Sequence, residues 1–297
     1  MPRKLRSSNA LWGQLGIALC AFFWSTSGLF IKLVDWHPLL IAGGRSAVAA
    51  LFLFVFRYIS MRRAGAYRPK NNPLYLAAGA AAYAATMISF VIANKLTTSA
   101  NAILLQYTAP VWAALLGWLV VREKPRWEIW AALALVMAGL VIFFREGLSL
   151  GSGGSLPGDS IALLSGFFFG ANSVCMRLQK DGNPADSMFF AHVLCAAVSV
   201  PFWFIFTPVL KPANALAILY MGTIQIGLAS LLFSYGIKRI SAVKAMLTAL
   251  LEAVLNPVWV LAITGEKPSA SALLGGTIIV SSVVFSSIVS QSRKQAA

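Results

Sequence analysis

Charged side chains are scarce in this sequence, because Asp, Glu, Lys and Arg together make up only 11% of its 297 residues. Soluble domains usually carry about 25% charged residues. The mean hydropathy is +0.77, so most segments need lipid or a neighbouring helix around them. The apolar runs are long and uniform, without the period-two alternation of barrel strands. We therefore predict an all-α polytopic membrane protein.

Residues that bind metals or carry out catalysis are few as well. The chain has two histidines and three cysteines, with no CxxC pair, so we expect no metal site, no disulfide framework and no cofactor. The phosphate-binding motif GxxxxGK[ST] is absent, as are the catalytic motifs GxSxG and HExxH. These absences leave an ATP-driven pump unsupported and argue against an intramembrane enzyme.

The apolar runs are long enough to be membrane-spanning helices, which need about 20 mostly apolar residues. Stretches such as "RRAGAYRPKNNP" and "LGSGGSLPGD" separate the runs as turns do. The first run follows basic residues, as in a signal peptide, but its uncharged stretch over 7–31 exceeds the roughly 7–15 residues of a signal-peptide core. We predict ten transmembrane helices, at 12–33, 39–58, 74–94, 99–121, 127–144, 159–178, 187–206, 215–236, 242–264 and 269–290.

Basic residues give the chain a net charge of +15 and gather at the ends of the apolar runs. They form no separate basic domain, so we expect no nucleic-acid binding. With ten spans, eighteen lysines and arginines fall on one side of the membrane and five on the other. The positive-inside rule then predicts that both termini are cytoplasmic.

The two halves of the chain resemble each other. "VVREKPRWEIWAALAL" at 120–135 aligns with "AITGEKPSASALLGGT" at an offset of 143, and "CAFFWSTSGLFIKL" at 20–33 aligns with "SGFFFGANSVCMRL" at an offset of 145. Each half has five predicted spans, an odd number, so the second half must insert upside down relative to the first. We predict two inverted five-helix repeats, 1–150 and 151–297, with a midplane binding site between them as in secondary transporters.

The paired stretches also resemble a known family. With "NKLTTSANAILLQYTAPVWAALLGWLVVREKP" in the first half and "IKRISAVKAMLTALLEAVLNPVWVLAITGEKP" in the second, the chain resembles the drug/metabolite transporter superfamily with two EamA-type repeats. Within it, the chain is most similar to YddG-like amino-acid exporters. The resemblance implies a multi-pass protein of the bacterial inner membrane. EamA repeats often place Glu-Pro in their fourth helix, whereas here the first repeat keeps only Pro110 and the second only Glu252.

Glu252 is the acidic residue deepest within an apolar run. A carboxylate at the centre of a spanning helix costs about 2.5–3.5 kcal/mol and usually faces the bundle interior or water. At helical spacing it shares one face with Thr248, Asn256 and Trp259, and this polar stripe predicts a cavity wall. The alternative is a neutral carboxyl that only hydrogen-bonds a neighbouring helix.

Other candidate residues combine an aromatic ring with small polar groups on the faces of the first, third, fourth, sixth and eighth spans. Such a surface suits a solute with an apolar body and a polar head, although packing within the bundle is the alternative for each residue. For Arg45 the alternatives are snorkelling to the membrane surface and binding a substrate carboxylate. The predicted substrate-binding residues are Trp24, Ser27, Tyr83, Met87, Asn101, Tyr107, Trp112, Phe169, Asn172, Gln225, Thr248 and Glu252.

The sequence thus predicts a secondary transporter that exports small metabolites, above all amino acids with aromatic or apolar side chains, by alternating access. A drug or nucleotide-sugar carrier of the same superfamily is the alternative within transport. A non-transport membrane scaffold is the alternative outside it. The expected partners are a small-molecule substrate and the lipid bilayer, and no oligomeric state is predicted.

Overall fold

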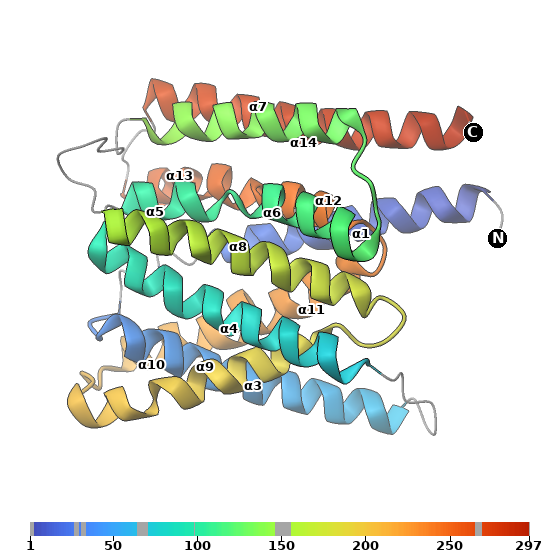
Figure 1. The fold of residues 1–297 in the computed structure, drawn as a ribbon. Coiled ribbons are helices and arrows are strands. Elements are labelled where there is room, and N and C mark those ends of the chain that lie inside the picture. Colours follow the sequence, from blue (N-terminus) through green and yellow to red (C-terminus); the bar gives the residue numbers. More distant parts are fainter. Residues whose placement is uncertain are drawn as a thin grey trace.

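The computed structural model describes residues 3–26, 30, 34–63, 71–97, 99–145, 156–264 and 269–296, and every regular element in these ranges is helical. The bundle is drawn in Figure 1. Its elements are α1 (Arg3–Trp24), α3 (Pro38–Arg63), α4 (Pro73–Leu96), α5 (Ser99–Gln106), α6 (Ala109–Leu116), the π-helical η1 (Gly117–Val121), α7 (Trp127–Phe144), α8 (Leu156–Leu178), α9 (Ala185–Ile205), α10 (Pro212–Tyr220), the π-helical η2 (Met221–Leu228), α11 (Ala229–Ile237), α12 (Ala242–Ala249), α13 (Leu251–Thr264) and α14 (Ala270–Ala296).

Seven segments of the described residues are long and apolar enough to cross a membrane. They coincide with seven of the ten predicted spans and confirm a polytopic helical protein. The other three predicted spans, 12–33, 242–264 and 269–290, correspond to α1, to α12 with α13, and to α14. They are not among the seven, and for the first and last of them the apolar stretches found within the described residues are Asn9–Trp24 and Ala270–Ser286.

The helices run in one general direction, so the bundle has two ends (Figure 1). Along one edge α7 packs against α14, and along the opposite edge α3 packs against α9, with α4 and α8 between them. The α7–α14 contact brings two backbones together, because a Cβ built on Gly275 would lie 2.5 Å from the carbonyl oxygen of Gly139. Such small residues are what allows membrane helices to pack closely.

Two of the long helical segments are broken in the middle. The segment 99–121 is interrupted at Tyr107–Thr108, just before α6 begins at Ala109, and Pro110 in the first turn of α6 has no backbone donor. The segment 242–264 is interrupted at Leu250. The offset of 143 that aligns the two halves pairs Tyr107 with Leu250, so both repeats carry their break at the same place. Broken helices are the usual site-forming elements of transporters with repeats.

Two glycines of α8 allow the first helix break, at Tyr107–Thr108, to pack closely against α8. A Cβ on Gly166 would lie 2.7 Å from the Thr108 hydroxyl and 2.9 Å from the Gln106 carbonyl oxygen. A Cβ on Gly170, one turn later, would lie 2.8 Å from the carbonyl oxygen of Ala109. The glycines at this spacing therefore form a smooth surface on which the interrupted helix rests.

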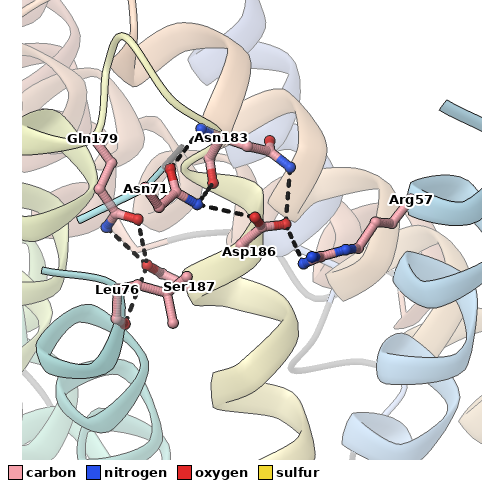
Figure 2. A network of polar contacts seen from close by, with 7 residues as sticks. All are labelled: Arg57, Asn71, Leu76, Gln179, Asn183, Asp186 and Ser187. Atoms are coloured by element: carbon pink, nitrogen blue, oxygen red, sulfur yellow. Dashed lines mark hydrogen bonds and ion pairs between the residues drawn. The ribbon is translucent and has the colours of Figure 1, made fainter. Parts of the chain in front are cut away.

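A polar network ties four helices together where α3 ends and α9 begins, at the end of the bundle that also holds both chain termini (Figure 2). The carboxylate of Asp186 accepts hydrogen bonds from Arg57 (2.6 Å), Asn71 (2.9 Å) and Asn183 (2.8 Å). In the same network, the Gln179 amide donates to the Ser187 hydroxyl at 2.9 Å. Residues from both halves of the chain thus share one set of hydrogen bonds at this end, which we call the basic end.

A second contact joins the two halves at the basic end. The guanidinium of Arg177 forms an ion pair with Glu123 at 2.9 Å and donates to the backbone carbonyls of Ile237 and Lys238. The Lys238 ammonium in turn donates to the carbonyl of Gly182 at 2.8 Å. Partial burial and the charge of Arg239 lower the pKa of Lys238, whereas Asp181 raises it. Basic side chains therefore connect helix ends here, through an ion pair and through hydrogen bonds to backbone carbonyls.

Replacing Asp186 by alanine is expected to destabilise the protein by about 1–3 kcal/mol, because three partly buried donors, Arg57, Asn71 and Asn183, lose their acceptor. The measurement is the melting temperature in detergent. Asp181→Ala, which removes an exposed aspartate five residues earlier, is the matched control and should leave the melting temperature unchanged. Equal melting temperatures for both variants would contradict the account of the network.

Replacing Gly170 by alanine is expected to cost about 1–3 kcal/mol, because the new methyl group would press on the backbone of α6. Gly117→Ala is the control, since a Cβ there meets no atom within 4 Å and the residue already has helical dihedral angles. It should be neutral or raise the melting temperature. A Gly170→Ala variant as stable as Gly117→Ala would show that the close approach of α8 and α6 is not required.

Candidate functional site

Aromatic rings from three helices meet at the centre of the largest core cluster. The ring of Trp24 on α1 lies 5.8 Å from that of Phe169 on α8 and 5.5 Å from that of Phe233 on α11. Trp24 and Phe169 occupy matched positions in the two halves of the sequence. This contact therefore joins equivalent positions of the two halves.

Tyr83 of α4 extends the aromatic group toward α9. Its ring lies 6.2 Å from Phe169 and stands edge-on to the imidazole of His192 at 5.6 Å. His192 is fully buried and contacts the hydroxyl of Ser230 at 3.5 Å. Met87, one turn after Tyr83, belongs to the same core. Four of the predicted site residues, Trp24, Tyr83, Met87 and Phe169, are thus brought together.

A chain of hydrogen bonds runs beside these rings toward the first helix break. The Gln106 amide donates to the Ser165 hydroxyl at 3.0 Å, which in turn donates to the backbone carbonyl of Thr86 at 3.1 Å. These three residues come from α5, α8 and α4. The side chains of Gln106 and Ser165 and the carbonyl of Thr86 thus find hydrogen-bond partners in apolar surroundings, and these bonds connect the broken helix to its neighbours.

Glu252 lies in the first turn of α13, directly after the second helix break. The residue is half-buried. Its helix packs against α14 and against α1, the helix that carries Trp24, so Glu252 stands at the second break on a helix that neighbours the aromatic group.

Two further predicted residues lie at the edges of this region. Tyr107, at the first break, belongs to a second core with its ring 6.4 Å from Phe144. The indole of Trp112 packs edge-on against Phe167 at 5.5 Å, and its buried Nε1 has no hydrogen-bond partner among the described residues. Tyr107 is part of the break at 107–108 and packs toward α7. Trp112 lies one turn after the break and packs toward α8.

Polar contacts within and between helices occupy three of the predicted side chains. The amide of Asn101 donates to Asp159 at 3.3 Å, ten residues and thus about 15 Å along α8 from Phe169. The amide of Asn172 donates to the Gly79 carbonyl at 2.9 Å. The hydroxyl of Thr248 donates to the carbonyl of Lys244 in its own helix. These bonds are sufficient reason for a buried polar residue, so each of the three has a packing role whatever else it does.

Gln225 belongs to η2, the π-helical segment that interrupts the helical run 212–237. Its side chain is buried, and its Oε1 has no partner within the ranges that the structure covers. π-helical insertions are frequent at functional sites. Gln225 therefore remains a site candidate, whereas the predicted residue Ser27 lies outside the described residues. No cluster of three or more potential metal ligands occurs in the described part of the chain.

The contact of Trp24 with Phe233 is one that sequence reasoning missed. Phe233 sits in an apolar run where no spacing distinguishes a site residue from a lipid-facing one. The same holds for Cys195 and Met188, which lie in the same core as Trp24. The alignment of the two halves gives no signal either, because the position matched to Phe233 at offset 143 is Phe90, a partly buried residue that packs in a different cluster.

The chain is similar to several known proteins over nearly its whole length. It is 23% identical over 290 residues to "Uncharacterized transporter YwfM" of Bacillus subtilis, covering 95% of this chain and 96% of that protein. It is 25% identical over 275 residues to an "Uncharacterized transporter" of Archaeoglobus fulgidus, covering 92% and 96%. It is also 27% identical over 180 residues to human "Solute carrier family 35 member G1", where it covers 57% of this chain and 48% of that protein.

A solved structure described only as the crystal structure of a protein covers 95% of this chain and 97% of its own, with a TM-score of 0.77 and 20% identity. At that identity the likeness concerns the fold alone. The sequence model of the EamA-like transporter family matches the chain twice, over residues 11–145 and 156–288. The relatives are named as transporters and not as enzymes. With both halves matched, the chain belongs to the EamA-like transporter family.

Proposed function

We propose that this transporter exports amino acids with aromatic or apolar side chains and that it works as a secondary transporter. The observation that carries the proposal is the meeting of Trp24, Tyr83 and Phe169 beside two broken helices, with Glu252 at the start of one of them. Aromatic faces bind apolar groups and cations alike. A carboxylate in the same region is a partner for an ammonium group.

The proposed architecture is ten transmembrane helices in two inverted repeats, residues 1–150 and 151–297. Three observations support it: the family model matches each half, the breaks fall at matched positions, and the matched residues Trp24 and Phe169 touch. An even number of spans requires both termini on one side, and α1 begins at the end of the bundle where α14 finishes (Figure 1). Because that end carries Arg177 and Lys238, we propose that it is cytoplasmic and that the protein lies in the inner membrane of a bacterium.

Alternating access is proposed to come from the two repeats rocking about the aromatic contact between Trp24 and Phe169. The breaks at 107–108 and at Leu250 supply places where a helix bends without losing many hydrogen bonds. At the basic end, the ion pair of Glu123 with Arg177 joins the two halves and must open when that end admits substrate.

The test is counterflow in proteoliposomes, with radiolabelled phenylalanine, leucine, glutamate, a nucleotide sugar and a cationic drug. The proposal expects uptake of phenylalanine and leucine against preloaded unlabelled substrate, and none of the other three solutes. Uptake of the drug or the nucleotide sugar alone would overturn the amino-acid assignment and keep the transporter. No counterflow with any small solute would favour a scaffold.

Trp24→Ala is expected to reduce counterflow of phenylalanine more than that of leucine, by about tenfold or more, because an aromatic contact is lost from the site. Trp12→Ala is the control, since Trp12 lies on the same helix with 55% of its side chain exposed. It should transport both amino acids normally. Equal loss for both substrates in Trp24→Ala would assign this residue to packing.

Glu252→Gln is expected to fold normally and to transport amino acids poorly, because the amide keeps the size and hydrogen bonding of the side chain but removes its charge. Folding is checked by the melting temperature, and transport by counterflow over a range of pH. A well-folded Glu252→Gln protein with wild-type flux at every pH would leave Glu252 as a helix-packing residue.

A further inference from the structure

Hydrogen bonds join α8 to α4 from one end of the bundle to the other. They run from the Thr97 hydroxyl to Asp159 (2.6 Å), from Ser165 to the Thr86 carbonyl (3.1 Å), from Asn172 to the Gly79 carbonyl (2.9 Å) and from Gln179 to the Tyr75 carbonyl (3.2 Å). The four residues of α8 and of the turn after it are six or seven positions apart, so they lie on one face. Bonds of this kind are costly to break where no water replaces them, and α4 and α8 therefore form a rigid pair.

The helix α5, which precedes the first break, is bonded to the same pair. The amide of Asn101 donates to Asp159 at 3.3 Å, and the amide of Gln106, the last residue of α5, donates to Ser165 at 3.0 Å. Both acceptors are residues of α8 that also bind α4 or the residue after it. Hydrogen bonds thus fix α4, α5 and α8 to one another, and we call these three helices the fixed unit.

The helix α6, which follows the break and runs toward the basic end (Figure 1), meets α8 in a different way. It rests on Gly170, where an added Cβ would lie 2.8 Å from the Ala109 carbonyl oxygen and 2.8 Å from the Cβ of Trp112. Trp112 is the one residue of α6 with a polar side-chain atom, and its buried Nε1 has no partner among the residues that the structure describes. Apolar contact has no preferred direction, so α6 can slide on α8 where α5 cannot.

Both ends of the segment formed by α6 and η1 have a special construction. At its start, Pro110 removes the backbone bond that would make α5 and α6 one continuous helix. At its end, Arg122 has a left-handed backbone with φ 59°, and the next residue, Glu123, pairs with Arg177 in the last turn of α8 at 2.9 Å. The two side chains of this pair are 29% and 13% exposed, so water is at hand when the pair separates. The segment therefore has a hinge at one end and a releasable contact with the fixed unit at the other.

We propose that residues 109–121, which form α6 and η1, are the moving gate of the basic end. The gate turns about the first helix break when the ion pair of Glu123 with Arg177 opens, and the fixed unit stays in place. This inference rests on the proposed alternating access and names the element that moves at this end. Tyr83 on α4 and Phe169 on α8 belong to the fixed unit, so these two rings of the aromatic group keep their 6.2 Å separation throughout the cycle.

The first experiment measures cysteine labelling by a water-soluble maleimide and needs no substrate. In the full chain with its three cysteines replaced by alanine, Ala113→Cys puts a thiol on the gate and Ala162→Cys puts one on the fixed unit. The two alanines are matched, with 1% and 0% of their surface exposed. Each is labelled with and without Glu123→Gln, which weakens the ion pair. If Ala113→Cys does not fold, Ala114→Cys, an equally buried position of α6, replaces it.

Glu123→Gln is expected to speed up labelling of Ala113→Cys by about threefold or more, since a partly exposed ion pair is lost, and to leave labelling of Ala162→Cys unchanged. Equal acceleration at both positions would mean that the whole bundle loosens, and no acceleration at either would mean that the ion pair does not hold the gate. Both of these results would overturn the proposal.

The second experiment compares phenylalanine counterflow in proteins that are cross-linked at two places. A Cβ on Gly79 would lie 3.2 Å from the Cβ of the native Cys175, a little less than the roughly 3.5–4.5 Å that disulfides span, so oxidised Gly79→Cys locks α4 to α8. Counterflow is expected to continue in this protein, as in the control Gly79→Cys with Cys175→Ser, which cannot form the bond. Glu123→Cys with Arg177→Cys, joined by a short bismaleimide, locks the gate and is expected to abolish counterflow.

The outcomes separate this inference from the proposed substrate. Loss of counterflow in oxidised Gly79→Cys that a reductant restores would show that α4 and α8 move apart, and would overturn the fixed unit. Normal counterflow with the bismaleimide in place would overturn the gate. If the wild-type protein exchanges no amino acid but the labelling difference is found, the amino-acid assignment fails and the gate stands. If Gly79→Cys does not fold, the labelling difference decides.

Discussion

The structure depends on one constraint, which is that polar groups inside the bundle have no water to bind. Backbone groups meet this constraint by forming helices. Interior side chains meet it by binding carbonyls of their own helix, as Thr86 does with Ala82, or by binding across helices, as Asn172 does with Gly79. Close helix packing follows from the same constraint, because Gly166 and Gly170 let the interrupted helix approach and limit the space left around its freed carbonyls. The polar network around Asp186 lies at one end of the bundle and holds the helix ends together there.

The same constraint separates packing residues from site candidates. A buried polar group that has found its partner, such as Asn101 or Thr248, is explained by the fold. Arg45 lies within a membrane-spanning helix, and its buried Nε has no hydrogen-bond partner among the described residues, so the fold does not explain it in this way. The two cases differ in whether the buried polar group has a hydrogen-bond partner. This criterion distinguishes buried polar residues that composition alone does not.

Sequence reasoning reached the all-helical polytopic class, seven of the membrane spans and the repeat that the family model matches twice. It succeeded because long apolar runs and repeated motifs are local signals. It predicted 99–121 as one continuous span and missed the break near Pro110, although the missing backbone donor there is visible in the sequence. It could not identify the partners of Asn101 and Asn172, which lie 58 and 93 residues away along the chain. Nor could it single out Phe233, because an apolar residue in an apolar run gives no sign of which neighbours it touches.

Among the matched positions at which the two repeats differ, one has Ala109 in the first repeat and Glu252 in the second. A site with a carboxylate on both sides of the axis would accept a polar molecule equally well in either of two opposite directions. In the proposed site the acid stands on one side only, so the two directions would differ in energy and a bound molecule would keep a single orientation. Its charged end then meets the same repeat whether the molecule has arrived from one face of the membrane or is about to leave by the other. The difference between Ala109 and Glu252 thus makes the two sides of a nearly symmetric scaffold chemically different.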